Sequence, residues 1–156
     1  MKIVVVSDSH RHKNILEDIY QANRDAEFFI HCGDIELAPS QCSPWLVVKG
    51  NNDLGFDFPE QRLLVIEKLK FLIIHSHQFY YSYRTSNLIA KAVELDCDIV
   101  CYGHTHNPHI EKREGIWLVN PGSLYYNRNG EQLGYVIIEL KEGKQIAIRQ
   151  VKLLGS

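Results

Sequence analysis

The chain has 156 residues, 45% of them apolar and 23% charged, which predicts one globular domain over residues 1–156 with room for a sizeable core. No apolar stretch approaches the roughly 20 residues of a transmembrane helix, and the first residues enter a strand pattern without a signal peptide, so we expect neither membrane insertion nor secretion. The net charge of −2 and the lack of a Lys/Arg-rich run argue against nucleic acid as a partner.

The first apolar run, Lys2–Val6, is typical of a buried strand and leads into Ser7-Asp8-Ser9-His10. In extended backbone, residues two apart face the same side, so Asp8 and His10 are predicted to close on one ion. A carboxylate oxygen and an imidazole nitrogen suit Mn, Fe or Zn. Taken alone, this pair is more typical of a solvated turn after a strand.

A helix is predicted over His12–Asn23, and the next strand pattern, Glu27–His31, ends at Cys32-Gly33-Asp34. Gly33 would let the backbone and an ion approach closely. Asp34 is the candidate for a carboxylate that bridges two cations.

The third strand pattern, Trp45–Val48, leads into Gly50-Asn51-Asn52-Asp53, and a short helical turn is expected near Pro39–Ser43. The residues after this strand fit a simple tight turn. Asn51 could instead offer its neutral carbonyl oxygen to a second metal. Asp53 is predicted to hydrogen-bond a neighbouring ligand, the outer support that metal sites need.

Two more strand patterns end in histidine pairs. Leu69–Ile74 precedes His75-Ser76-His77, where either histidine could ligate. Cys97–Tyr102 precedes Gly103-His104-Thr105-His106, whose two histidines are expected on one face of an extended segment. An isolated pair of this kind is usually a surface turn, but five strand ends with metal-ligand residues in one short chain favour a joint metal site.

The remaining patterns indicate the fold class. A second helix is predicted over Arg84–Leu95, and after Gly103 the chain changes to hairpins. Their strands are expected at 108–112, 115–120, 133–140 and 145–151, separated by Arg113-Glu114, Asn127–Gly130 and Glu142-Gly143. Strand–helix–strand units followed by antiparallel strands predict two sheets packed face to face with helices outside.

The four cysteines, Cys32, Cys42, Cys97 and Cys101, do not form a C-x-x-C pair. Three of them lie in or beside strand patterns, so we expect reduced thiols that act as small apolar side chains, in a cytoplasmic protein. Zinc binding by Cys97 and Cys101 is the alternative, which alternation within an extended run disfavours.

The ordered set of motifs resembles the calcineurin-like metallophosphoesterase superfamily. The motifs are Asp8-x-His10, Gly33-Asp34, Gly50-Asn51-x-Asp53, His75-x-His77 and Gly103-His104-x-His106. Short length, compact spacing and Asn120-Pro121-Gly122-Ser123 are similar to the small bacterial and archaeal phosphodiesterases of the YfcE type. The resemblance extends from residue 1 to about residue 140 and implies an α/β fold, a four-layer α/β/β/α sandwich of two mixed sheets flanked by helices.

The resemblance implies a dinuclear metal centre. One divalent ion would be held by Asp8, His10, Asp34 and His106, and the other by Asp34, Asn51, His75 and His104. Mn²⁺ is the expected ion, with Ni²⁺, Zn²⁺, Fe²⁺ and Co²⁺ as alternatives. The resemblance also implies a bridging hydroxide as nucleophile, a homodimer, and catalytic roles for Asp8, Asp34, Asn51, His75 and His104.

Asn52 departs from the pattern of many family members, which carry a histidine here as proton donor to the leaving group. A carboxamide cannot supply a proton at useful pH, so general-acid help worth about 10²- to 10⁴-fold is missing from this position. The small phosphodiesterase branch also tends to lack that histidine. His77 or His31 could replace it, although His77 is as well suited to hydrogen-bond substrate or a ligand, and His31 to a place in the core.

Two loops are candidates for substrate contact. Tyr80, Tyr81, Tyr83 and Arg84 follow the His75 motif, and Tyr125, Tyr126 and Arg128 follow Ser123. Tyrosines could lie against a ring and an arginine against phosphate. Alternatively, the first loop packs at a dimer interface or a sheet edge. Ser123 is expected to be a structural cap, because no Gly-x-Ser-x-Gly elbow is present.

The predicted function is a metal-dependent phosphodiesterase that acts on a small phosphodiester. A phosphomonoesterase would use the same metals, and Asn52 argues mildly against it. A non-catalytic binding scaffold is the third alternative, because a retromer subunit of eukaryotes has this fold. Some metal-motif residues are altered in that subunit, whereas all seven are present here.

Overall fold

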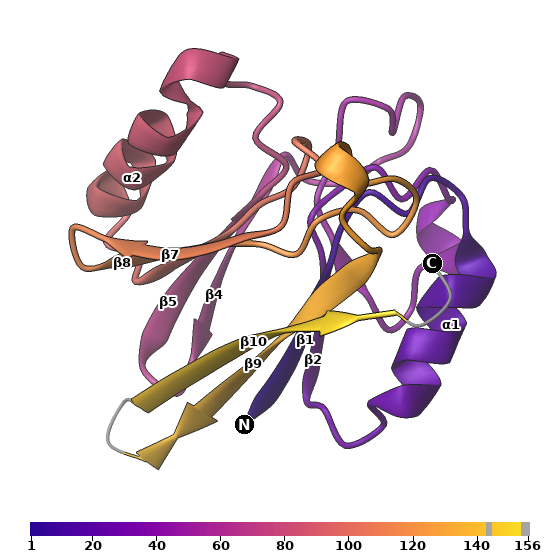
Figure 1. The fold of residues 1–156 in the computed structure, drawn as a ribbon, viewed down its shortest axis with the longest axis horizontal. Coiled ribbons are helices and arrows are strands. Elements are labelled where there is room, and N and C mark those ends of the chain that lie inside the picture. The colour runs from indigo at the N-terminus through magenta and orange to yellow at the C-terminus, as the bar shows by residue number, and fades with distance from the viewer. Residues whose placement is uncertain (143–144, 154–156) are drawn as a thin grey trace.

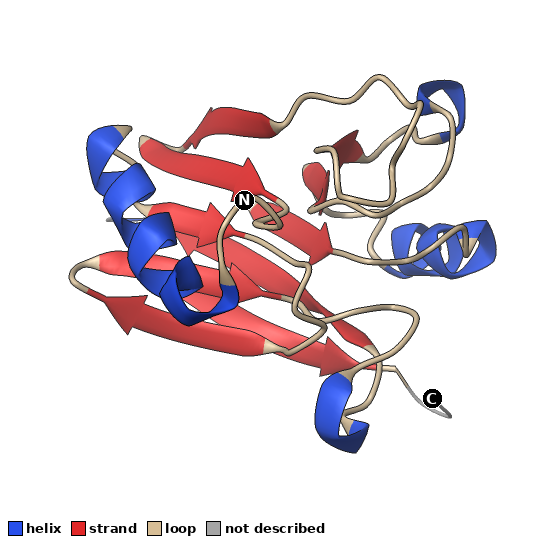
Figure 2. Cartoon of the chain, turned by 90° about the horizontal axis from the view of Figure 1, so that it is seen from above, coloured by secondary structure: helices blue, strands red, loops and turns tan. Residues whose placement is uncertain are grey.

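The structure, a computed structural model that describes residues 1–142 and 145–153, contains two five-stranded sheets that lie face to face, with a helix against each outer face (Figure 1). In the perpendicular view the strands again occupy the interior and the helices the periphery (Figure 2). This is the expected four-layer α/β/β/α arrangement, and the predicted fold class is confirmed.

The first sheet has the strand order β10-β9-β1-β2-β3. Its strands are β1 (Lys2–Val6), β2 (Phe28–His31), β3 (Leu46–Val47), β9 (Gly134–Lys141) and β10 (Gln145–Lys152). The first three run parallel, and β9 and β10 are antiparallel to their neighbours. Helix α1 (Lys13–Ala22) connects β1 to β2 and covers this sheet, within one residue of its predicted bounds at either end.

The second sheet has the order β4-β5-β6-β8-β7. Its strands are β4 (Gln61–Ile66), β5 (Leu69–Ile74), β6 (Ile99–Cys101), β7 (His109–Arg113) and β8 (Ile116–Asn120). Helix α2 (Arg84–Glu94) connects β5 to β6 and covers this sheet. Short 3₁₀ turns lie at η1 (Pro39–Gln41), η2 (Tyr81–Tyr83) and η3 (Arg128–Gly130). In the described part of the chain, neither helix reaches the length and apolarity needed to cross a lipid bilayer.

Alternating side chains of the strands build three apolar layers. Ile3 of β1 lies between the two sheets, whereas the neighbouring Val4 packs on the α1 side. Phe71 and Leu72 of β5 divide in the same way between the central layer and the α2 side. Both strands are therefore buried on two faces over most of their length, which is why each contains an unbroken apolar run, Ile3–Val6 in β1 and Phe71–Ile74 in β5.

The sequence analysis missed β4, because two of its signals are weak. β4 is an edge strand whose Val65 is 71% exposed, and its apolar run is short, Leu63–Ile66, after the polar Gln61 and Arg62. It joins β5 through Glu67 and Lys68, both with positive φ (50° and 69°). Such a turn is usually marked by Asn or Gly, which the chain does not have here.

The expectation that the strands after Gly103 are only antiparallel is wrong for β8. This strand pairs antiparallel with β7, as predicted, but it also runs parallel to β6, with Val100 opposite Leu118. The predicted turn at Glu142-Gly143 lies partly outside the described residues. The parallel pairing of β8 matters because it brings a third strand end of the second sheet to the edge where β5 and β6 also end.

The carboxyl ends of the parallel strands of both sheets meet at one edge of the molecule, at the top in Figure 1. The amide of Asp8, after β1, donates to the Gly33 carbonyl after β2 (3.0 Å), and the amide of Gly103, after β6, donates to the His75 carbonyl after β5 (3.3 Å). Strand ends of this kind are where open α/β sheets bind ligands.

Candidate metal centre

The structure brings all seven predicted metal ligands together at this edge, on the loops after β1, β2, β3, β5 and β6. Hydrogen bonds tie the loops of the two sheets to each other. The His104 amide donates to Asp8 Oδ2 (3.1 Å), and Ser123 Oγ donates to the Asp8 carbonyl (2.7 Å). The side chains of one cluster thus come from both sheets.

The backbone at the ligands is not extended, contrary to the sequence prediction. Asp8, His10, Asp34, His104 and His106 have φ between 46° and 72°, in the left-handed region. The expectation that the two pairs spaced two residues apart share one face of an extended segment is therefore wrong. Left-handed turns aim these side chains inward instead. Non-glycine residues in this conformation cluster at functional sites, where surrounding contacts hold them in place.

Two glycines allow the loops to pack this closely. Gly33 has φ of 108°, and a Cβ at this position would lie 2.6 Å from His75 Nδ1. A Cβ at Gly103 would lie 2.6 Å from Asp8 Oδ2. Any side chain at either position would push a predicted ligand out of place, so both positions require glycine.

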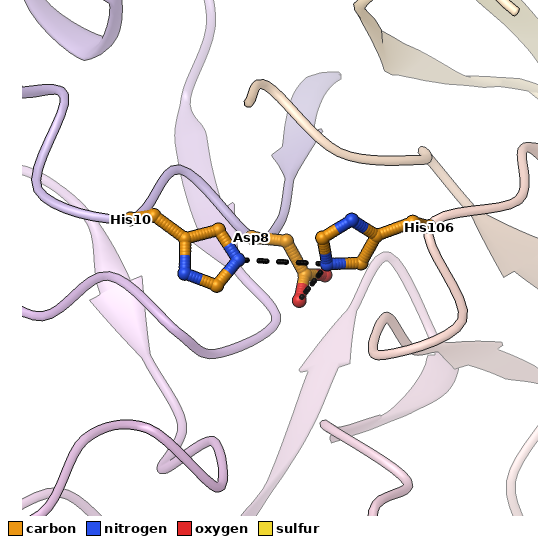
Figure 3. A group of neighbouring side chains, drawn as sticks. All are labelled: Asp8, His10 and His106. Carbon is orange, nitrogen blue, oxygen red and sulfur yellow. Dashed lines mark hydrogen bonds and ion pairs between the residues drawn. The ribbon is translucent and has the colours of Figure 1, made fainter. Parts of the chain in front are cut away.

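Asp8, His10 and His106 form the first group of possible ligand atoms (Figure 3). His106 Nε2 lies 3.3 Å from Asp8 Oδ1 and 3.5 Å from His10 Nε2. One donor atom of each residue lies within 4.8 Å of the others. A carboxylate oxygen with two imidazole nitrogens is a donor set for a first-row divalent ion.

Asp8, Asp34 and His75 form the second group, and all three are buried. His75 Nε2 lies 3.3 Å from Asp34 Oδ2 and 3.8 Å from Asp8 Oδ1. Asn51 extends this group, since its Oδ1 lies 3.0 Å from both His75 Nε2 and His104 Nδ1. Asp8 belongs to both groups, whereas Asp34, the predicted bridging carboxylate, belongs to the second.

Three of the histidines are oriented by an oxygen that faces Nδ1. The partners are the Cys32 carbonyl for His75 (2.7 Å), the Tyr126 carbonyl for His106 (2.6 Å) and Glu36 Oε2 for His10 (3.0 Å). Each acceptor places the ring proton on Nδ1. Nε2 is thereby the nitrogen that faces the centre, as in ligating histidines whose other nitrogen is hydrogen-bonded.

Glu36 is a residue of the candidate site that the sequence analysis missed. It pairs with His10 at 3.0 Å, and both side chains are mostly buried. Its amide donates to Asp53 Oδ1 (2.7 Å), and its φ of 55° turns the chain back toward the loop after β1. The only sequence signal was an acidic residue two positions after Asp34, where no strand pattern ends.

Asp8 Oδ1 shows that a cation fits this cluster. Asp8 is fully buried, and its Oδ2 accepts hydrogen bonds from Ser7 Oγ and the His104 amide. Oδ1 has no hydrogen-bond partner among the described residues, although it lies near the Nε2 atoms of His75 and His106. A buried carboxylate oxygen without a donor is costly. A divalent ion would satisfy it, so the donor set present fits such an ion.

The protonation states of Asp8 and His104 also suit a metal. Burial by itself would raise the pKa of Asp8, but the positive charge of His75, the neighbouring His106 imidazole and the hydrogen bond from Ser7 hold this pKa below its usual value. Burial lowers the pKa of His104 to about 4, assisted by the charge of His75. At neutral pH the Asp8 carboxylate is therefore anionic and the His104 imidazole neutral, the forms that ligate metals.

Asp53 and Asn52 support Asp34 without facing the centre. The buried Asp53 carboxylate accepts hydrogen bonds from the amides of Asp34 (2.8 Å) and Gly50 (2.7 Å). Asn52 donates twice to the Asp34 carboxylate, from its amide to Oδ1 (2.8 Å) and from Nδ2 to Oδ2 (3.0 Å). The residue that replaces the family histidine thus orients a predicted ligand.

His31 lies in the core, as the sequence analysis favoured. Its Nδ1 accepts a hydrogen bond from the Gly33 amide (3.1 Å), so Nε2 carries the proton and donates to Ser9 Oγ (2.8 Å). Burial lowers the pKa of His31 to about 3. A neutral, fully hydrogen-bonded imidazole in the core cannot act as a proton donor to substrate.

His77 lies beside the centre but outside both ligand groups. Its ring centroid is 5.4 Å from that of His75 and 6.3 Å from that of His104. Its buried Nδ1 has no hydrogen-bond partner within residues 1–142 and 145–153. The ring is therefore placed to contact a substrate or a ligand, the role that the sequence left open.

Ser123 is a structural cap, as predicted. Its Oγ accepts hydrogen bonds from the amides of Tyr125 (2.9 Å) and Tyr126 (3.0 Å) while it donates to the Asp8 carbonyl. The hydroxyl is fully occupied and buried. It orders the loop that places the Tyr126 carbonyl against His106.

A cavity of about 510 Å³ opens beside the first ligand group. It is lined by His10, Arg11, His12, Glu36, Asn52 and Tyr125. The Tyr125 ring lies 5.3 Å from the His10 ring, so one of the two predicted tyrosine loops does border the centre. Tyr80, in the other loop, is 85% exposed.

Comparison with known proteins identifies related sequences. The family model described as "Calcineurin-like phosphoesterase superfamily domain" matches residues 1–143. A probable metallophosphoesterase of Bacillus subtilis, YsnB, is 33% identical over 144 residues, covering 90% of this chain and 85% of that protein. Phosphodiesterase MJ0936 of Methanocaldococcus jannaschii is 28% identical over 172 residues, covering 95% of this chain and 99% of that protein.

Two solved structures illustrate the shared fold. A conserved uncharacterised protein from Streptococcus pneumoniae, described as a predicted phosphoesterase, superposes with a TM-score of 0.87 at 29% identity over 97% of this chain and 88% of that chain. Vps29 of Entamoeba histolytica complexed with Zn²⁺ superposes with a TM-score of 0.73 at 20% identity over 97% of this chain and 99% of that chain.

Glu36→Ala is expected to weaken metal binding about 10- to 100-fold, because His10 loses the oxygen that holds its ring in place. Calorimetric titration of metal-stripped protein with Mn²⁺ measures the change. Glu17→Ala is the matched control, since Glu17 lies on the exposed face of α1 and contacts Gln21. Equal Mn²⁺ affinities for Glu36→Ala and the unaltered protein would show that His10 does not depend on Glu36.

Acid is expected to destabilise the metal-free protein through His31, whose pKa is about 3 when folded against an ordinary value of 6.5. Between these values the unfolded chain binds more protons at His31, so the free energy of unfolding falls as the pH drops through this window and is unaffected above it. His31→Gln should make this slope shallower by up to about 1.4 kcal/mol per pH unit. Urea unfolding in EDTA at several pH values gives the slope of unfolding free energy against pH for both proteins. Equal slopes would contradict the assignment of this pH dependence to His31.

Proposed function

The chain belongs to the calcineurin-like phosphoesterase superfamily, and from this premise we propose that it is a metal-dependent phosphodiesterase that hydrolyses a small phosphodiester. Members of this family hydrolyse phosphoesters with divalent metals. The observation that carries the proposal is Asp8 Oδ1, a buried anionic oxygen without a hydrogen-bond donor among the described residues, close to two imidazole nitrogens. This is the surrounding in which a cation stabilises the folded chain.

We assign one divalent ion to Asp8, His10, Asp34 and His106, and a second to Asp34, Asn51, His75 and His104. The mixture of imidazole, carboxylate and amide donors suits Mn²⁺ first, with Ni²⁺, Zn²⁺, Fe²⁺ and Co²⁺ as alternatives. When bound, two such ions neutralise charge on the phosphoryl oxygens and lower the pKa of a nucleophilic water. The catalytic set in this proposal is Asp8, Asp34, Asn51, His75 and His104.

The chain itself keeps this set in position before substrate arrives. The Nδ1 contacts of His75 and His106 direct their Nε2 atoms inward. Asn52 donates two hydrogen bonds to the Asp34 carboxylate, and Asp53 accepts one from the Asp34 amide. Preorganised groups of this kind avoid the cost of rearrangement during the reaction. Substrate would enter through the cavity between His12, Asn52 and Tyr125.

Asn52 bears on the choice of substrate. Its Nδ2 donates to Asp34 and has no proton to give at neutral pH, so it cannot assist departure of a poor leaving group. His77 is the neighbouring group best placed to hydrogen-bond the substrate, since its Nδ1 has no partner in the described part of the chain. The relative from Methanocaldococcus jannaschii carries the name phosphodiesterase, which supports a diester.

Two other functions remain as alternatives. A phosphomonoesterase would use the same side chains and would differ only in how the ester group is accommodated. A binding scaffold is favoured by the likeness to Vps29, but at 20% identity that likeness concerns the fold alone. The complete set of seven ligand residues and the unsatisfied Asp8 Oδ1 favour an enzyme.

A cytoplasmic location is supported by the cysteines. All four are free and buried. Burial raises the pKa of Cys101 to about 12, and that of Cys42 to about 11, so the thiols stay protonated and unreactive. Buried thiols used as apolar packing are typical of proteins from reducing compartments.

Metal-stripped protein is expected to hydrolyse bis-p-nitrophenyl phosphate only after a divalent ion is added, and faster than p-nitrophenyl phosphate. Asp34→Ala should lower the diester rate by about 10²- to 10³-fold or more, as when a group that stabilises transition-state charge is removed. Asp25→Ala is the control, because Asp25 is exposed and pairs with Lys2 far from the centre.

Three outcomes would contradict the proposal. Full activity of Asp34→Ala would remove the assigned centre from the reaction. Faster turnover of the monoester would favour the phosphomonoesterase. Absence of turnover with any ion, in protein shown to bind metal, would favour the scaffold.

A further inference from the structure

A second cavity, of about 390 Å³, lies beside the metal centre but contains none of its ligands. It is lined among others by Tyr81, Arg84, Thr85, Thr105, Asn107 and Arg128. Thr105 stands between His104 and His106, so the cavity shares a wall with the ligand loop after β6. We call this cavity the two-arginine pocket.

Arg84 begins α2 and is only 8% exposed. Its Nε donates to the Ser76 carbonyl (3.2 Å) and its Nη2 to the Phe79 carbonyl (2.9 Å), which hold the guanidinium in one orientation. Within the described ranges no carboxylate pairs with it, and Nη1 has no acceptor. A nearly buried guanidinium without a counter-anion is costly unless a ligand supplies the negative charge.

Arg128 approaches the pocket from η3. Its Nε donates to the Thr105 carbonyl (2.8 Å), and its amide donates to the His106 carbonyl (2.9 Å). These bonds attach Arg128 to the ligand loop itself. It also has no carboxylate partner in the part of the chain that the structure describes. Two hydrogen-bonded arginines thus face one cavity, and among the described residues no acidic side chain lines it.

The rest of the lining is polar and uncharged or already paired. Thr85 and Asn107 offer a hydroxyl and an amide as hydrogen-bond donors. His109, also in the lining, lies 2.9 Å from Glu111, which in turn pairs with Arg113. Glu111 is thereby engaged on the β7 side, and the net charge facing the cavity is positive.

We propose that the two-arginine pocket binds a second phosphate group of the substrate, separate from the phosphodiester at the metal centre. Guanidinium groups match phosphate oxygens in geometry and charge. Because hydrogen bonds already hold Arg84 and Arg128, these side chains lose little conformational entropy when phosphate binds. A volume of about 390 Å³ exceeds that of a phosphate and leaves room for a sugar attached to it. The inference rests on the proposed function and narrows the substrate to a diester that also carries a phosphomonoester.

The binding step is tested without turnover. Inorganic phosphate is titrated into metal-free protein, and amide resonances of Thr85, Asn107 and Asn129 are followed by NMR. We expect saturable shifts at these residues. The phosphate affinity obtained from them should be at least about 10-fold lower in Arg128→Gln, which loses one exposed guanidinium. Arg84→Lys keeps the charge but loses the paired N–H donors of the guanidinium, so its phosphate affinity should also be lower. Arg24→Gln, in the turn after α1 where Arg24 contacts Tyr20 and Gln21, should bind phosphate as the unaltered protein does.

Unchanged phosphate affinity in Arg128→Gln and Arg84→Lys, with both proteins folded by circular dichroism, would overturn the inference. Shifts confined to the metal-ligand loops would do the same. Neither result depends on catalysis, so failure of the pocket is distinguished from failure of the proposed function.

The substrate step compares two esters with the metal-loaded protein: thymidine 5′-(p-nitrophenyl phosphate) and the same compound with a 3′-phosphate. We expect a KM at least about 10-fold lower for the phosphorylated ester, with kcat little changed, and loss of this difference in Arg128→Gln. Equal KM values would overturn the inference while leaving the phosphodiesterase intact. Absence of turnover with both esters, together with phosphate binding in the pocket, would contradict the proposed function alone.

Discussion

The buried carboxylate of Asp8 is the group on which the rest of the centre depends. It follows β1 in the first sheet, yet its Oδ2 is held by an amide after β6 and its Oδ1 faces His75 after β5, both in the second sheet. A fully buried anion is stable only among donors and positive charge. The strand ends of both sheets therefore meet around it, and the edge between the two sheets becomes a site.

Hydrogen bonds maintain a strained backbone conformation around this carboxylate. Left-handed φ at a non-glycine residue costs about 1–3 kcal/mol, and five predicted ligands adopt it. The amide of Asp34 donates a hydrogen bond to the Asp53 carboxylate, and Ser123 Oγ donates one to the carbonyl of Asp8, so both residues hold the same segments. The conformation is thus maintained by residues that do not face the centre. The loop that carries Ser123 continues to Arg128, so the same segment borders both the metal centre and the two-arginine pocket.

The sequence predicted most of the fold because β1 and β5 are buried on both faces and appear as apolar runs. It also predicted which side chains gather at the candidate centre, because they follow closely after strand patterns. It missed β4, whose outer face is exposed, and Glu36, whose contact with His10 joins residues 26 apart in the chain. It placed the ligand pairs on extended backbone. Glycine indicates left-handed backbone in a sequence, whereas Asp and His, which adopt it here, do not.

The central claim, that these side chains hold two ions close enough to share one phosphate, is tested most directly by electron paramagnetic resonance of the protein loaded with two equivalents of Mn²⁺. The account predicts the multiline spectrum of a magnetically coupled Mn²⁺ pair, because ions in such sites lie roughly 3.5–4 Å apart. The six-line spectrum of isolated Mn²⁺ at full loading would contradict it and would leave a mononuclear centre.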